Sequence, residues 1–171
     1  MVCIVETRLN IARTPENGLE GEWRAVDIEN QPRPVILDPH RRAHLPKLLH
    51  LVSSNQAKSP WIICKREHIE ETDRYIPLGT HGGQFSWDDI LTALKDRGIS
   101  SVMIEGGATV INKVLEDRIA DVVIITIAPV FIGHEGLGIG PKFQHHQLHW
   151  LQDTQTLSVG KDIVVAGRLK T

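Results

Sequence analysis

The sequence predicts an α/β protein in which a sheet is flanked by helices. Short runs of β-branched residues alternate along the chain with amphipathic segments, and this alternation is typical of strands joined by helices. One of these runs, Val102 to Glu105, leads through two glycines directly into a predicted helix. Because 171 residues with 41% apolar and 23% charged content suit one globular unit, we expect a single domain over residues 1–171.

Seven short runs rich in β-branched residues are predicted strands. They are Val2 to Val5, Pro34 to Leu37, Trp61 to Cys64, Arg74 to Pro77, Val102 to Glu105, Val122 to Ala128 and Ile163 to Leu169. The stretches Glu16 to Gln31 and Gly133 to Gln155 are polar and rich in Gly, His and Gln, so we expect long loops there.

Two helices have clear predicted boundaries. Ser86 is placed to cap the first, with Asp89 three residues further on, and Gly98 ends it. The second runs from about Thr109 to Glu116 and carries apolar residues on one face, namely Val110, Ile111, Val114 and Leu115.

The glycine pair Gly106-Gly107 lies between the strand and the second helix. A helix that begins where a strand ends presents unpaired backbone N–H groups and the positive end of its dipole, and both favour a bound phosphate. Glycines allow the backbone to approach that phosphate with no Cβ between them. The turn therefore predicts a phosphate site, although glycines that serve only the geometry of the turn explain the pair equally well.

Composition narrows the function classes. The net charge is −2 with acidic and basic residues interspersed, which argues against nucleic acid and membrane-surface partners and leaves a small-molecule substrate. No apolar run approaches membrane-spanning or signal-peptide length, and Cys3 and Cys64 are the only cysteines, so we expect a cytoplasmic protein. His145, His146 and His149 are not grouped with Cys or carboxylate ligands at a recognised spacing, so we expect no metal site.

Four segments resemble the pyrimidine reductase family of riboflavin biosynthesis. Val102 to Asn112 and the strand end Ile127 to Gly133 carry the family motifs, while Pro32 to Pro39 and Gly160 to Lys170 are similar to the fungal and yeast members in particular. The resemblance covers most of the chain from about Gln31 onward and keeps the order of the family motifs.

The resemblance implies a dihydrofolate-reductase-like α/β fold with a central, mostly parallel sheet, in a protein that commonly forms homodimers. It also implies that NADPH reduces the ribosylamino group of a pyrimidine phosphate and so opens the sugar. In that scheme the first residues of the helix would hold the cofactor pyrophosphate, and Gly133 would also contact the cofactor. The pyrophosphate residues are Gly106, Gly107, Ala108 and Thr109.

Other side chains are candidates for the same cavity. Glu105 would border the nicotinamide and the substrate, and Asp38 would line the cleft from a neighbouring strand, although Asp-Pro is also an ordinary turn former. Thr7, His134 and Glu135 are candidate substrate residues.

A basic group follows Asp38. Arg41 and Arg42, with His40 and His44, suit the 2′-phosphate of NADPH, and an exposed basic turn is the alternative.

The N-terminus departs from the family pattern. We expect the chain to lack the family's first strand, its Ser-Leu-Asp-Gly-like substrate segment and the helix that follows. Val5-Glu6-Thr7 stands in place of a Val-Gly-x-Gly-Thr turn, and Ala12 to Pro15 in place of an Ala-Asp-Asp/Asn-Pro segment. A Glu6 side chain is expected to clash with the cofactor or repel its phosphates.

Three explanations of this departure stay open. The sequence is truncated, or it belongs to a reductase that builds both pockets from other segments, or the cavity has been reused without any cofactor. In the last case Glu105, desolvated beside Val102, Ile104 and Val110, would be the general acid of an isomerase or cyclase of fungal secondary metabolism, for example in an epoxide rearrangement. An inactive homologue that binds or dimerises without turnover is a further alternative.

Overall fold

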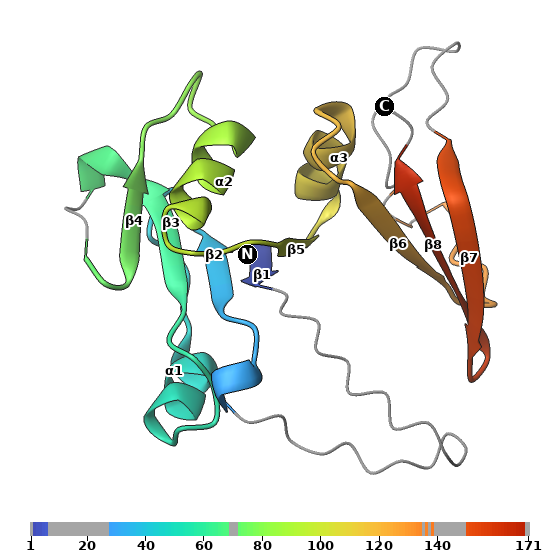
Figure 1. Cartoon of the computed structure of the whole chain (residues 1–171), viewed down its shortest axis with the longest axis horizontal. Helices are drawn as coiled ribbons and strands as arrows, with labels where there is room; N and C mark the ends of the chain where they lie inside the picture. The colour runs from blue at the N-terminus through green and yellow to red at the C-terminus, as the bar shows by residue number, and fades with distance from the viewer. Residues whose placement is uncertain are drawn as a thin grey trace. The chain divides into compact units, whose positions relative to one another are not determined.

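The computed structural model describes residues 2–6, 28–68, 72–134, 136, 138 and 150–169 (Figure 1). The chain divides into two compact units, Met1–Glu105 and Gly106–Thr171. The division falls inside the predicted glycine turn. A single domain over the whole chain stays a prediction.

The first unit holds a five-stranded sheet in the order β4-β3-β2-β1-β5. Its strands are β1 (Val2–Glu6), β2 (Pro34–Leu37), β3 (Trp61–Lys65), β4 (Tyr75–Leu78) and β5 (Val102–Glu105). Its helices are α1 (Pro46–Ser53) and α2 (Trp87–Lys95), with short 3₁₀ turns η1 (Ile28–Asn30) and η2 (Arg66–His68).

The expectation of a mostly parallel sheet is wrong in one respect. The strands β2, β3 and β4 are parallel, but β1 lies antiparallel to both β2 and β5, so parallel and antiparallel pairings are equal in number. Both ladder types satisfy backbone hydrogen bonds, and the direction of a strand is not encoded in its apolar pattern.

The core of the first unit lies on both faces of its central strands, because Ile62, Ile63 and Cys64 are successive residues of β3 and all three are buried. Ile36, Ile63 and Cys64 are buried on β2 and β3. The helix α2 buries Trp87, Ile90 and Leu94, whose spacing of three and four residues places them on one helix face. Ser86 is the N-cap of α2 as predicted, but its side chain makes no capping hydrogen bond.

The second unit combines one helix with a three-stranded antiparallel sheet in the order β6-β8-β7. Its elements are α3 (Ala108–Glu116), β6 (Val122–Ile127), β7 (Leu151–Val159) and β8 (Asp162–Leu169). The strand β7 was not predicted, because the expected loop ran to Gln155. Its sequence is mostly polar and β7 lies at the sheet edge, where solvent-facing positions need no apolar residues.

The strand β7 packs closely against its neighbour β8 at Gly167. A register shift lies between Gln152 and Gln155. A Cβ on Gly167 would lie 2.9 Å from Leu151 Cβ and 3.0 Å from Thr154 Cγ2, so the sheet packs without room for a side chain at this position. Within the described part of the chain, no helix has the length and apolarity needed to cross a lipid bilayer.

Candidate functional site

In the first unit, one edge of the sheet collects the candidate carboxylates. The strands β2, β3 and β4 are parallel, and β5 runs in the direction of β2 because both are antiparallel to β1. Asp38 directly follows β2, and Glu105 ends β5. Since only β1 lies between these strands, the two backbones are about 10 Å apart at this edge, called here the carboxyl edge.

The carboxylate of Asp38 is held by the turn that follows it. Asp38 is buried, its Oδ1 accepts a hydrogen bond from the backbone N–H of Arg42 at 2.9 Å, and its Oδ2 accepts one from Ala43 at 2.7 Å. Its own N–H donates to the carbonyl of Ile63 on β3 at 2.9 Å. Because both oxygens are engaged, this geometry suits a residue that shapes the turn, which was the alternative interpretation of Asp38.

The same turn carries two arginines at the carboxyl edge. Arg42 is exposed. Arg41 has a positive φ of 55°, and its guanidinium carbon lies 5.2 Å from the centre of the Tyr75 ring. Burial raises the pKa of the Cys64 thiol beneath this turn, while Arg41 lowers it and Asp38 raises it further. The thiol is therefore held protonated at neutral pH.

In the second unit, the glycine pair opens α3. Gly106 has a φ of 151°, which L side chains rarely adopt. Gly107 is the N-cap of α3 with extended backbone angles, and its carbonyl accepts hydrogen bonds from the N–H groups of Val110 and Ile111 at 3.1 and 3.3 Å. The N–H groups of the first turn, which includes Ala108 and Thr109, have no partner within the helix by the geometry of any α-helix.

The position of Gly107 fits a ligand phosphate. A Cβ added to Gly107 would meet no atom within 4 Å, so packing does not require a glycine there. A small residue at this N-cap instead leaves open space beside the N–H groups and the positive dipole end of α3. Thr109 is exposed and Ala108 is half-buried. The residues present therefore fit a pyrophosphate group at the start of this helix.

The structure contradicts the desolvation expected for Glu105. Side chains along β5 alternate, with Val102 and Ile104 half-buried and Met103 and Glu105 exposed. Successive residues of a strand point to opposite faces of the sheet, so the neighbours of Glu105 in sequence do not bury it. Glu105 is therefore an exposed carboxylate at the carboxyl edge.

The remaining candidate residues follow the strands β1 and β6 in the sequence. Gly133 and His134 follow β6 and are both exposed, and the φ of 77° at Gly133 favours glycine. Thr7 and Glu135 lie outside the described residues. The backbone of Glu6, next to Thr7, pairs with Val102 at the amino end of β5.

The described residues contain no candidate metal site. Among them, no group of three or more His, Cys, Asp or Glu side chains is placed to hold an ion. The histidines His145, His146 and His149 lie outside that part.

The fold and the glycine turn define an α/β protein with a glycine N-cap at the start of α3 and open space where the Cβ of that residue would lie. The chain belongs to the RibD C-terminal domain family, whose model matches residues 1–165. The family resemblance found in the sequence and its dihydrofolate-reductase-like fold are thereby confirmed.

Curated relatives include two yeast proteins named 2,5-diamino-6-ribosylamino-4(3H)-pyrimidinone 5′-phosphate reductase. The one from Kluyveromyces lactis is 32% identical over 166 residues, which cover 89% of this chain and 64% of the relative. The one from Kluyveromyces marxianus is 33% identical over 167 residues, which cover 90% of this chain and 66% of the relative. The chain thus spans slightly less than two thirds of either relative.

Solved structures show the same relationship. The Saccharomyces cerevisiae riboflavin biosynthesis reductase Rib7 matches with a TM-score of 0.71 and 30% identity, over 83% of this chain and 72% of Rib7. RibD of Acinetobacter baumannii matches with a TM-score of 0.61 and 21% identity, over 85% of this chain and 40% of RibD. At that lower identity the second match supports the fold alone.

Proposed function

We propose that this chain is a reductase that uses NADPH to reduce the ribosylamino group of a pyrimidinone 5′-phosphate. The names of its relatives support this activity. The observation that carries the cofactor half of the proposal is Gly107, which stands at the N-cap of α3 with open space where a Cβ would be.

The residues at the start of α3 would bind the cofactor pyrophosphate. Gly106 and Gly107 allow close approach of the backbone, and the N–H groups of Ala108 and Thr109 would donate to phosphate oxygens. NADPH supplies the hydride when bound, so the protein contributes binding, orientation and charge. Gly133 is proposed as a further cofactor residue.

On the first unit, the arginines of the turn after β2 are proposed contacts of the cofactor 2′-phosphate. A guanidinium binds phosphate through two parallel N–H groups, and the buried Asp38 carboxylate holds the backbone that carries Arg41 and Arg42. We therefore propose Asp38 as a positioning residue for these arginines. Glu105 is proposed to orient the substrate as an exposed carboxylate.

No observation favours the acid-catalysed isomerase or cyclase. That alternative needs a desolvated Glu105, and Glu105 is exposed. Thr7, His134 and Glu135 stay predictions as substrate residues.

We also propose a homodimer. One face of the β6-β8-β7 sheet carries Val122, Ile124 and Leu157, which are 54%, 66% and 64% exposed in the single chain. Contiguous exposed apolar residues of this kind mark interaction surfaces, and a second copy of the chain is the partner that the family resemblance implies. Ile124→Lys is expected to convert the dimer to a monomer in sedimentation equilibrium, whereas Ser158→Lys on the opposite face of β7 leaves the mass unchanged.

Cofactor binding tests the proposal directly. NADPH should quench protein fluorescence on titration, and at 100 times its Kd it should stabilise the fold by about 2.7 kcal/mol in thermal unfolding. Replacing NADPH by NADH tests the 2′-phosphate contact. If NADPH neither quenches nor stabilises the chain, the reductase proposal is wrong.

Turnover separates an enzyme from an inactive homologue. Loss of NADPH absorbance should require the ribosylamino-pyrimidinone 5′-phosphate, and the product should carry an open ribityl chain by mass spectrometry, two hydrogens heavier than the substrate. A chain that binds NADPH and gives no product with this substrate would instead be a binding homologue.

A further inference from the structure

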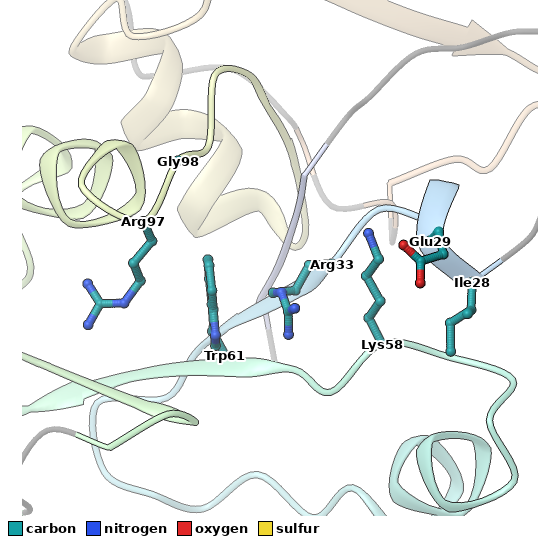
Figure 2. A pocket seen from close by; sticks show the side chains of 7 residues that line it. All are labelled: Ile28, Glu29, Arg33, Lys58, Trp61, Arg97 and Gly98. Carbon is teal, nitrogen blue, oxygen red and sulfur yellow. The ribbon is translucent and has the colours of Figure 1, made fainter.

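A hollow lies in the first unit, at the amino ends of the strands β2 and β3. It has a volume of about 510 Å³ and is lined mainly by Arg33, Lys58, Trp61 and Arg97, with Glu29 and Gly98 (Figure 2). Arg33 directly precedes β2, whereas Asp38 directly follows it. Because β2 has four residues, this hollow and the carboxyl edge are separated by about 13 Å of strand.

Strand pairing brings these residues together from distant parts of the sequence. Val35 pairs in parallel with Trp61, so the residues before β2 and before β3 meet at the same edge. The Nη1 group of Arg33 donates a hydrogen bond to the carbonyl of Ser59 at 2.7 Å. Arg97 arrives from the turn that ends α2, where Gly98 has a φ of 82°.

Trp61 separates the two guanidinium groups. The guanidinium carbon of Arg33 lies 4.7 Å from the centre of the Trp61 ring, and that of Arg97 lies 6.0 Å from it. Figure 2 shows the two side chains on opposite sides of the ring. The electron-rich ring faces attract both cations and so offset part of their mutual repulsion. This sandwich holds two guanidinium groups beside one hollow.

The charges of the hollow are not balanced by its own residues. Among the described residues of the lining, Arg33 and Lys58 supply two positive charges beside one carboxylate, that of the exposed Glu29. Lys58 is half-buried, and its amine makes no hydrogen bond or ion pair with the residues that the structure describes. Among the described residues, Arg33 uses one of its five N–H donors, in the bond to the Ser59 carbonyl. Unused donors with an excess of positive charge suit a phosphate group.

We propose that this hollow binds a phosphate-bearing small molecule, at a site distinct from the carboxyl edge of the same sheet. Lys58 and Arg33 supply the charge and the N–H donors. Because guanidinium groups cover both faces of Trp61, recognition rests on charge and hydrogen bonds, without stacking on the ring. The site goes beyond the proposed reductase function and does not depend on it.

Pyrophosphate is the probe of choice. It should be titrated by calorimetry into the full chain carrying Gly107→Asp, a change that places a carboxylate at the start of α3 and blocks anion binding there. Binding should persist in this background. Adding Lys58→Gln should weaken it about tenfold, the loss expected for one charge-assisted hydrogen bond.

Two further variants distinguish this site from general attraction of anions. Glu29→Gln removes the one carboxylate among the described lining residues and should tighten pyrophosphate binding severalfold. Lys161→Gln removes an equal charge from the exposed turn between β7 and β8 and should leave binding unchanged. Binding should weaken as the salt concentration rises.

Two results would contradict the proposed phosphate site. Failure of pyrophosphate to bind the Gly107→Asp chain overturns the proposal. Equal weakening by Lys58→Gln and Lys161→Gln also overturns it, because it would mean diffuse attraction of anions to the positive charges of the chain. Parallel titrations with inorganic phosphate and with adenosine 5′-monophosphate identify the source of the group. Tighter binding of the nucleotide supports a nucleotide ligand, and tighter binding of pyrophosphate supports an inorganic one. Loss of NADPH binding in Gly107→Asp, with pyrophosphate retained, supports both proposals separately.

Discussion

The Asp38 carboxylate accepts a hydrogen bond from the backbone N–H of Ala43 at 2.7 Å, five residues further along the chain. Together with the bond from Arg42, this closes the turn after β2 around a buried charge. A carboxylate so engaged orders the backbone on which the arginines stand. Four predictions concern this turn, the buried Cys64 thiol of the first unit, and Gly107 and Gly167 of the second unit.

Loss of the Asp38 carboxylate should destabilise the first unit. Asp38→Ala removes two charge-assisted hydrogen bonds and should lower the free energy of unfolding by about 3 kcal/mol, measured by urea denaturation. Asp38→Asn retains one acceptor and should cost about half as much. The exposed Asp73 offers a control, because Asp73→Ala should change stability by less than about 0.5 kcal/mol. Equal stability of Asp38→Ala and the wild type would refute the role of Asp38 in the turn.

Replacement of Gly107 should separate cofactor binding from folding. Asp and Asn are both good N-cap residues, and a Cβ at this position meets no atom within 4 Å, so Gly107→Asp and Gly107→Asn should fold with wild-type stability or better. The added carboxylate should repel the cofactor pyrophosphate and weaken NADPH binding more than tenfold beyond Gly107→Asn. Equal NADPH affinities of the two variants in fluorescence titrations would place the phosphates elsewhere.

Gly167 should not tolerate a methyl group. Gly167→Ala brings a Cβ within 2.9 Å of Leu151 Cβ and should destabilise the β6-β8-β7 sheet by about 1–3 kcal/mol. Gly79→Ala is the matched control, because a Cβ at Gly79 meets nothing within 4 Å. Urea denaturation followed by circular dichroism compares the two. Similar midpoints for both variants would show that β7 does not pack this closely on β8.

The free energy of unfolding at alkaline pH should depend on the buried Cys64 thiol. The pKa of Cys64 is raised by burial above its ordinary value of 9.0, so the unfolded chain releases the proton at a lower pH than the folded chain. The contribution of the protonated Cys64 thiol to the free energy of unfolding is therefore complete below about pH 9. It is lost as the pH rises through the pKa of Cys64 in the folded protein. Cys64→Ala should flatten this decline above about pH 9, and Cys3, present in both proteins, cancels in the comparison. Parallel pH profiles for the two proteins would contradict the shift.

Much of the fold could be predicted from local sequence. The bounds of β2 and β5 match the predicted runs Pro34 to Leu37 and Val102 to Glu105 at both ends. Short β-branched runs between turn residues are a strong local signal. The helix α3 begins one residue before the predicted start. By contrast, β7 is polar and depends on pairing with β8, so no apolar pattern marked it.

The candidate site was only partly predictable. The glycine turn is a local motif of contiguous residues, and its helix start could be predicted. Whether Glu105 is desolvated is decided by the face of β5 on which it lies, and that face is exposed. Two hydrogen bonds within the turn after β2 engage both oxygens of the Asp38 carboxylate, so it is not free to contact a ligand. The sequence alone did not show whether Asp38 shapes this turn or lines a cleft.

The sequence by itself determined the family, most of the strands and the position of the Gly106-Gly107 turn, because each depends on residues close together in the chain. The tertiary structure decided how the strands pair, that the Asp38 carboxylate is hydrogen-bonded within its turn, and that Arg33 and Lys58 lie beside one hollow. The Arg33 guanidinium bonds to the Ser59 carbonyl across 26 residues of sequence. Such contacts follow from the order and direction of strands in the sheet, which apolar periodicity does not encode.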